Sequence, residues 1–133
     1  MAHASVWAAA TIVLLGIAGC ASTDSSTSSA SREPRRCFWA RDVRNFAPVN
    51  SSTINIRVGA DTFRVDTFGS CRDLDWTNRM ALVTTGGSSI CVGSGIGASI
   101  VTRGPSGRQR CAIQSITALS PEEVAALPAR QRP

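Results

Sequence analysis

The first twenty residues are the feature that most constrains what this chain can fold into. From Val6 to Leu15 the sequence carries no charge, and the apolar run is about 14 residues long when it is extended to Gly19. This length suits the hydrophobic region of an export signal and falls short of the ~20 residues that a membrane-spanning helix needs. Small residues close the run directly before Cys20. We therefore expect residues 1–19 to be a cleaved signal, and not a buried helix or an uncleaved anchor.

The tetrapeptide Ile17-Ala18-Gly19-Cys20 resembles the cleavage and lipidation site of bacterial lipoproteins. The resemblance implies that the Cys20 thiol accepts diacylglycerol and that the freed amine is then acylated, for example with palmitate. One departure is that Met1–Ser5 contains no Lys or Arg. Ala21 follows the cysteine where an Asp would favour retention in the inner membrane. The resemblance thus implies a lipoprotein of the bacterial cell envelope, held in the outer membrane by its N-terminal lipid and facing the periplasm.

Residues 20–36 have the composition of a linker. Ser and Thr dominate the segment after Cys20, which leaves nothing to bury, so we expect it to be disordered. Its ~15 residues reach about 50 Å when fully extended. Three arginines close the linker, Arg32, Arg35 and Arg36. They either contact anionic lipid headgroups beside the anchor or are simply solvated.

Four further cysteines follow the linker, at positions 37, 71, 91 and 111. An even number of cysteines in a small exported domain predicts two disulfides, which compensate for a marginal hydrophobic core. Four cysteines allow three pairings, and we favour Cys71–Cys91 with Cys37–Cys111. The loops that these bonds close would contribute about 3 and 4.5 kcal/mol on chain-entropy arithmetic. No cysteine pair has metal-site spacing, and the only histidine, His3, leaves with the signal, so neither a metal nor a cofactor is expected.

The folded part reads as a mainly β domain over residues 37–127. Residues 53–58 alternate between apolar and polar side chains, and residues 61–68 resume that alternation after a glycine turn, which predicts a β-hairpin. Residues 37–46 are either a strand or a turn-rich opening, and residues 71–76 a turn or a single helical turn. Further strands are expected at residues 80–83, as a buried central strand, and at 89–92, 96–102 and 110–116. The fold class is therefore a small barrel or sandwich of about six or seven short antiparallel strands.

The sequence also predicts how the domain ends. Ser120, Pro121 and Glu123 have the spacing of a capping box with proline at the first helical position. A short helix should therefore begin here and stop near Pro128. Residues 128–133 form the tail, and we expect its last four residues, Arg130 to Pro133, to fray.

Few residues qualify for chemistry. Asp73 and Asp75 are candidates for general acid–base work, although carboxylates at a turn more often cap backbone amides. No histidine or lysine remains in the mature chain to activate a serine, and the disulfides consume the cysteines. No catalytic residue is therefore assigned. Trp39 and Trp76 could line a binding face, but in so small a domain we expect them in the core.

A glycine-rich stretch, Gly93-Ser94-Gly95-Ile96-Gly97-Ala98, can be read as Gly-x-Gly-x-x-Ala. A dinucleotide site needs a helix directly after such a motif. β-Branched residues follow here instead, so we expect a turn or bulge. The net charge of +5 rests on 14 scattered arginines and no lysine. Without a basic stripe interleaved with aromatics, nucleic acid is not an expected partner.

The order of several short motifs resembles an uncharacterised family, a domain of unknown function, of small proteobacterial envelope lipoproteins with a four-cysteine β-rich domain. The motifs are Cys37-Phe38, Cys71 to Leu74, Ile90-Cys91, Arg110 to Ile116 and Leu119 to Glu123. The resemblance implies a disulfide-bonded β domain and no activity. Two hypotheses follow: a non-catalytic lipoprotein that binds an unknown envelope protein or glycan, or a small periplasmic enzyme or inhibitor-like module that uses Asp73, Asp75 and nearby arginines.

Overall fold

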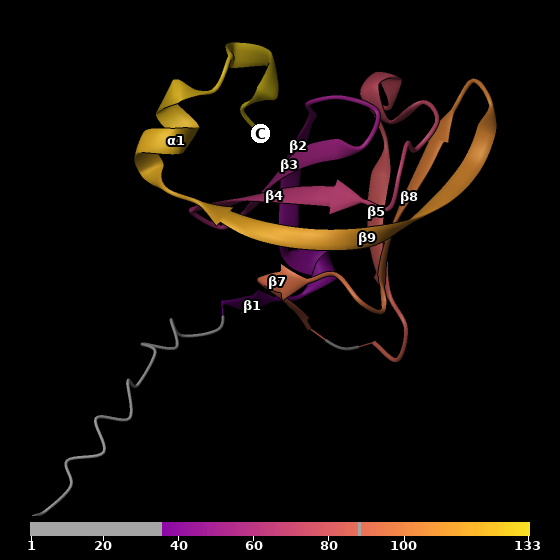
Figure 1. Ribbon diagram of the computed structural model, residues 1–133, viewed down its shortest axis with the longest axis horizontal. Helices are drawn as coiled ribbons and strands as arrows, with labels where there is room; N and C mark the ends of the chain where they lie inside the picture. Colours follow the sequence, from indigo (N-terminus) through magenta and orange to yellow (C-terminus); the bar gives the residue numbers. More distant parts are fainter. Residues whose placement is uncertain (1–35, 88) are drawn as a thin grey trace, which may run out of the picture. The chain divides into compact units, whose positions relative to one another are not determined.

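The computed structural model describes residues 36–87 and 89–133. The predicted signal, Cys20 and the linker up to residue 35 lie outside the described residues. Within the described part a seven-stranded antiparallel sheet has the order β2-β3-β4-β9-β8-β5, with β7 also paired to β9, and a two-stranded sheet joins β1 to β6 (Figure 1). The strands are β1 (Cys37–Phe38), β2 (Val43–Pro48), β3 (Thr53–Val58), β4 (Asp61–Thr67), β5 (Met80–Thr84), β6 (Ile90–Cys91), β7 (Gly93–Ser94), β8 (Ala98–Gly104) and β9 (Gly107–Leu119).

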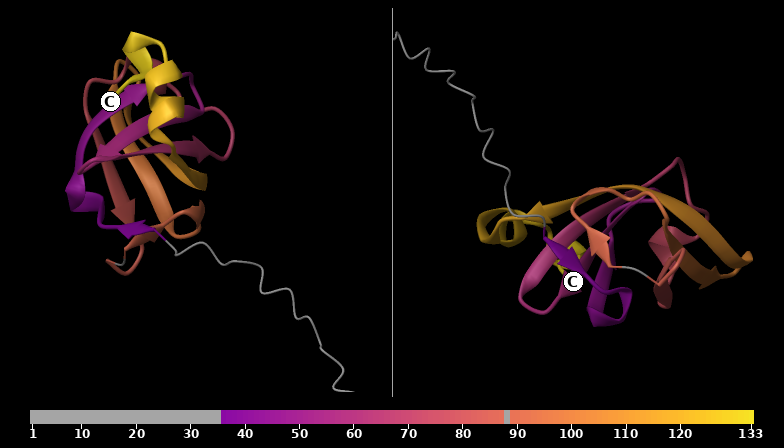
Figure 2. Two further views of the ribbon diagram at one scale, coloured as in Figure 1. Left: turned by 90° about the vertical axis from the view of Figure 1, so that its left-hand side faces the viewer. Right: turned by 90° about the horizontal axis from the view of Figure 1, so that it is seen from below.

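The sheet curls into an open barrel, because the long strand β9 belongs to both of its halves (Figure 2). Its first half pairs with β8 from Gly107 to Ala112, and its second half pairs with β4 from Ile113 to Leu119. The predicted fold class and the predicted hairpin, now β3 and β4, are confirmed. The expectation that residues 80–83 form a central strand is wrong. They lie in β5, which is an edge strand. Only one side of this apolar run faces the core, and there Leu82 is buried.

A one-residue bulge in β9 explains its hydrophobic pattern. Asp66 of β4 pairs with Ser115, whereas the next residue, Thr67, pairs with Ile113, so Gln114 has no partner in β4. Positions that face the core therefore shift from odd to even along the strand: Ile113 before the bulge belongs to the core cluster, and so does Ile116 after it. A bulge bends its strand and increases the local twist, which here lies where β9 passes from one half-sheet to the other.

The core lies inside the curl of the sheet. Apolar side chains from the concave face meet there, and the rings of Phe38 and Phe63 lie 4.8 Å apart, centroid to centroid. Leu74, from the 3-10 turn η2 (Leu74–Trp76), is fully buried with them. The buried members of this cluster are Phe38, Ile54, Ile56, Phe63, Val65, Cys71, Leu74, Leu82, Ile90, Ala98, Ile100, Ile113 and Ile116.

Two disulfides are present, as predicted, but the predicted pairing is wrong. Cys37 bonds Cys91, and Cys71 bonds Cys111. The first strand does not reach the last one: β1 pairs with β6, which sets Cys37 directly opposite Cys91 with 4.0 Å between their Cα atoms. Cys71, buried to 1% exposure, then joins Cys111 on β9. Disulfides persist in oxidising compartments, so the pair indicates an extracytoplasmic location.

The C-terminal segment begins with the predicted capping box. Ser120 caps helix α1 (Pro121–Ala126): its Oγ accepts a 3.2 Å hydrogen bond from the Glu123 amide, and the Glu123 carboxylate accepts a 2.7 Å bond from the Ser120 amide. The helix ends at Ala126, with Leu127 as its C-cap, before the proline as expected. The yellow segment in Figure 1 includes this helix and the residues that follow it.

The expectation that residues 130–133 fray is wrong. The tail forms the 3-10 turn η3 (Ala129–Gln131), which packs against β2, and Pro133 is buried. Arg132 supplies the reason, because its guanidinium donates hydrogen bonds to the carbonyls of Ala125 (2.6 Å) and Leu127 (2.8 Å) at the end of the helix. These are carbonyls that a helix C-terminus leaves without intrahelical partners.

Candidate functional site

Asp73 and Asp75 do not form a pair of carboxylates directed at a common site. The Asp73 carboxylate accepts a 2.9 Å hydrogen bond from the Ser106 amide, so it holds the turn between β8 and β9. Its backbone is left-handed, with φ of 61°, a conformation that Asp tolerates better than most residues. Asp75 lies in η2 and is exposed. This arrangement matches the capping role that carboxylates at turns commonly take.

The tryptophans are exposed, so the expectation that they lie in the core is wrong. Trp76 is 78% exposed and Trp39 is 45% exposed. Each lies at a short 3-10 turn, Trp76 in η2 and Trp39 directly before η1 (Ala40–Asp42), and neither occupies an inward position of a strand. The Arg41 guanidinium lies 5.0 Å from the centroid of the Trp39 ring, a cation–π contact.

The glycine-rich stretch is a turn between β7 and β8, as predicted, and no helix follows it. Gly95 packs so closely against β9 that a Cβ atom there would overlap the side chain of Ile113. Ala98 begins β8 after a positive φ at Gly97. The glycines therefore serve strand packing and the turn.

A groove lies where the two edges of the curled sheet approach each other. It has a volume of ≈ 570 Å³ and is lined by β2, β5 and η1. β2 and β5 each have one sheet neighbour, so no second strand pairs with their other edges within the described part of the chain. On β2, however, the Phe46 amide already donates a 2.9 Å hydrogen bond to the Asn45 side chain, and Pro48 has no N–H. Its apolar lining includes Val43, Phe46, Met80 and Leu82, and its charged lining is Arg41 and Arg44.

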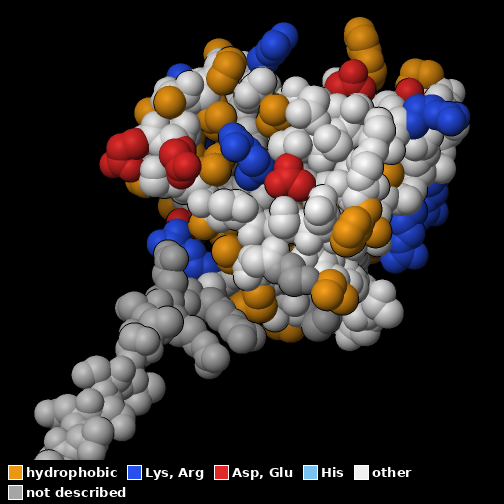
Figure 3. Space-filling view, viewed as in Figure 1, with side chains coloured by type: hydrophobic (Ala, Val, Ile, Leu, Met, Phe, Trp, Pro, Cys, Tyr) orange, Lys and Arg blue, Asp and Glu red, His pale blue; other side chains and the backbone are white. Residues whose placement is uncertain are grey.

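A second candidate surface is the convex face of β5, β8 and β9. We name Arg79, Arg103, Arg108 and Arg110 the arginine face. All four are exposed, and two shallow hollows beside them are lined by these arginines together with Val83 and Val101. Figure 3 shows blue side chains gathered over the β8–β9 end of the molecule. The sequence scatters these residues over 32 positions, so the sequence reasoning missed them. The signal in the sequence was the spacing of Arg108 and Arg110, which lie two positions apart on a strand and therefore share a face.

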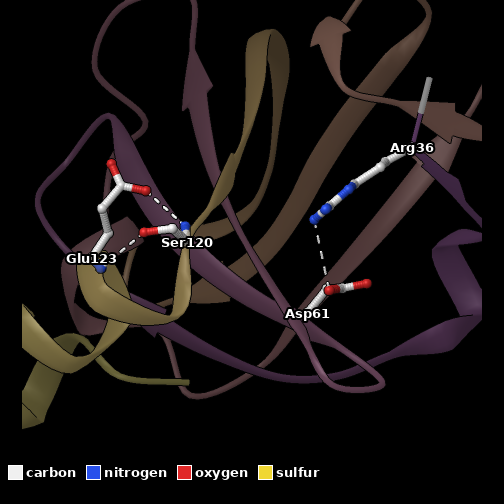
Figure 4. Close-up of polar contacts among 4 residues, drawn as sticks. All are labelled: Arg36, Asp61, Ser120 and Glu123. Carbon is white, nitrogen blue, oxygen red and sulfur yellow. Dashed lines mark hydrogen bonds and ion pairs between the residues drawn. The ribbon is translucent and has the colours of Figure 1, made fainter. Parts of the chain in front are cut away.

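A third hollow, of ≈ 520 Å³, is lined by Arg36, Asp61, Ser120 and Glu123 among others. Figure 4 shows the capping box and the only ion pair among the described residues. That pair joins Arg36 to Asp61 at 3.8 Å, and both side chains are more than half exposed. Such a pair contributes little to stability. A backbone amide and the Ser120 hydroxyl donate to the Glu122 carboxylate, and both hydrogen bonds lower the pKa of that group. The polar side chains around this hollow thus serve the helix cap, and we assign no ligand to it.

No group of three or more His, Cys, Asp or Glu side chains is placed to hold a metal ion within residues 36–87 and 89–133. In the same part of the chain, no helix is both long and apolar enough to span a membrane.

The fold and the surfaces together define the class: a small, disulfide-bonded open β barrel with a capped C-terminal helix and two lined surfaces, a groove and an arginine face. The chain belongs to a family of unknown function, DUF6491, which matches residues 1–133. No curated protein and no solved structure matches the chain.

Proposed function

We propose that this chain is a lipid-anchored protein of the bacterial envelope whose β domain binds an extended segment of another envelope protein and performs no catalysis. The anchor is Cys20, at the outer membrane, and the domain faces the periplasm. The lipobox-like sequence and the two disulfides support this location.

The observation that carries the binding proposal is the groove between the unpaired edges of β2 and β5. An edge strand presents N–H and C=O groups, and an extended peptide satisfies them by adding a strand. We assign that strand to the edge of β5, because on β2 the Phe46 amide already donates to the Asn45 side chain and Pro48 has no N–H. The groove volume of ≈ 570 Å³ lies within the usual range of ligand sites. Phe46 and Leu82 offer apolar contacts, and exposed Arg44 favours an acidic side chain in the bound segment.

The alternative of a small enzyme or inhibitor-like module rests on Asp73 and Asp75. Asp73 already accepts a backbone hydrogen bond at a turn, so the contacts of this residue favour a structural role. A glycan partner would use the exposed Trp76 as a stacking surface, but Trp76 lines none of the hollows described above, whereas the groove combines apolar and basic lining. The groove therefore supports a protein partner better.

Two measurements test the proposal. Replacing Cys20 by Ala should move the protein from the membrane fraction to the soluble periplasm, and a variant that stays bound to membranes would contradict lipid anchoring at Cys20.

The groove is tested by a photo-crosslinking amino acid placed at Arg44, with the same amino acid at exposed Arg130 as the control position. We expect a discrete crosslinked partner in intact cells from position 44 and none from position 130. Equal crosslinking from both positions would contradict a partner in the groove.

A further inference from the structure

The arginine face concentrates positive charge that the fold does not neutralise. Arg103 on β8 is the direct cross-strand partner of Arg108 on β9, and Arg110 lies two positions further along, opposite Val101. Arg79 joins them just before β5. Like charges directly opposite each other in a sheet are destabilising, so this arrangement costs the domain stability unless an anion binds there.

Within residues 36–87 and 89–133, no carboxylate forms an ion pair with these arginines. Among the described residues the only ion pair is the distant Arg36–Asp61, and no hydrogen bond or ion pair of the four arginine side chains is present. Asp73 lies at the same end of the sheet, but its carboxylate accepts the hydrogen bond from the Ser106 amide at the turn that follows β8. The guanidinium groups are therefore free to bind an external anion.

Apolar side chains lie between the arginines. Val83 and Val101 line the hollows, and Ala81 is exposed beside them. At the adjoining strand end, Phe68 is 64% exposed, and its amide donates a 3.0 Å hydrogen bond to the Ala112 carbonyl, two positions beyond Arg110 on β9. Basic groups interspersed with apolar ones suit the interface of a membrane, where headgroup phosphates and acyl chains lie close together.

We propose that the arginine face binds the headgroup phosphates of anionic lipids in the membrane that carries the anchor. This inference rests on the proposed lipidation of Cys20, because a short tether turns a weak contact into an intramolecular one with an effective concentration of the order of millimolar. Residues 21–36 span at most about 55 Å when extended, which keeps the face within reach of its own membrane. Arginine suits this role because its planar fork binds phosphate oxygens in pairs.

The size of the expected effect follows from the number of arginines. A basic residue at an anionic membrane surface strengthens binding by about fivefold. Replacing Arg103, Arg108 and Arg110 by Gln should therefore weaken binding on the order of 100-fold. The matched control replaces Arg44, Arg57 and Arg130, which are also exposed, so both triple variants lose the same charge.

The test uses the full chain with Cys20→Ala, so that lipid does not mask the contact, in co-sedimentation with vesicles. We compare phosphatidylcholine vesicles with vesicles in which one lipid in three is phosphatidylglycerol; the neutral vesicles report any binding by the apolar N-terminus. The expected result is stronger binding to the anionic vesicles, lost in R103Q/R108Q/R110Q and largely kept in R44Q/R57Q/R130Q. Circular dichroism confirms that each variant is folded.

Three results would overturn the inference. Equal loss in both triple variants would show a response to net charge and not to this face, and equal binding to neutral and anionic vesicles would exclude phosphate recognition. A single-stranded oligonucleotide that binds more tightly than the vesicles, through the same three arginines, would assign the face to nucleic acid. A failure of the proposed lipid anchoring is seen in a different experiment. Mass spectrometry of the wild-type protein would then find the N-terminal peptide without lipid, while the vesicle binding of the Cys20→Ala chain would stay the same.

Discussion

The side-chain amide of Asn55 donates a 2.8 Å hydrogen bond to the main-chain carbonyl of Gln131, 76 positions later in the chain. Asn55 lies on β3 with its side chain fully buried on the convex side, away from the core, since its neighbours Ile54 and Ile56 belong to the core. The C-terminal segment thus packs over this polar residue and supplies its hydrogen-bond acceptor.

Asn55→Ala should lower the free energy of unfolding by about 1–3 kcal/mol, because it leaves the carbonyl of Gln131 without its donor. Removing residues 128–133 should destabilise the domain further, since the bonds from Arg132 are also lost. Urea denaturation measures both effects. Gln131→Ala is the control, because only the backbone of Gln131 accepts this bond; a loss as large as that of Asn55→Ala would contradict the account.

Peptide mapping without reduction should recover Cys37 linked to Cys91 and Cys71 linked to Cys111. The two bonds close spans of 54 and 40 residues, which correspond to about 4 kcal/mol each on chain-entropy arithmetic. Since these entropic contributions are nearly equal, the burial of the cysteines decides which disulfide stabilises the domain more. Replacing Cys71 and Cys111 by Ser should therefore lower the melting temperature more than replacing Cys37 and Cys91, because Cys71 is in the core. The reverse order would refute this reasoning.

Ser120→Ala removes one half of the capping box and should cost about 1 kcal/mol. It should also raise the pKa of Glu122 toward its usual value, because the Ser120 hydroxyl is one of the two donors that lower that pKa. Because the pKa of Glu122 is lower in the folded than in the unfolded protein, its ionised carboxylate stabilises the fold at pH values above the unfolded pKa. This contribution is lost as the pH falls through the folded pKa. NMR titration of the carboxyl carbon, with Ala126→Ser as a control that leaves the cap intact, measures the shift. An unchanged Glu122 pKa in Ser120→Ala would contradict the assigned hydrogen bond.

Deleting Gln114 should prevent folding or reduce stability severely. The deletion removes the bulge, so one half of β9 exchanges its buried and exposed faces, and either Ile113 or Ile116 leaves the core. Gln114→Ala keeps the residue count and changes only an exposed side chain, so its stability should stay within about 0.5 kcal/mol of the wild type. Thermal unfolding compares the two variants; a stable deletion variant would show that the bulge does not set the register.

Local patterns predicted the local structure well. The alternation around Ile54 and Ile56 and the glycine turn after them predict the β3–β4 hairpin, and Ser120 and Glu123 predict the helix cap, because each feature depends on residues only a few positions apart. The exposed positions of Trp39 and Trp76 could not be predicted in this way. Their exposure depends on 3-10 turns whose direction is set by the strands that flank them.

The sequence by itself determined that the chain is mainly β, that four cysteines form two disulfides and that a short capped helix ends the domain. Tertiary structure alone decided which cysteines pair, that Met80–Thr84 is an edge strand, and that Arg79, Arg103, Arg108 and Arg110 share one face. The physical reason is the order of the strands. Spacing along the chain specifies hairpins and caps, whereas the pairing of β1 with β6 and the place of β9 between β4 and β8 depend on contacts between residues far apart in sequence.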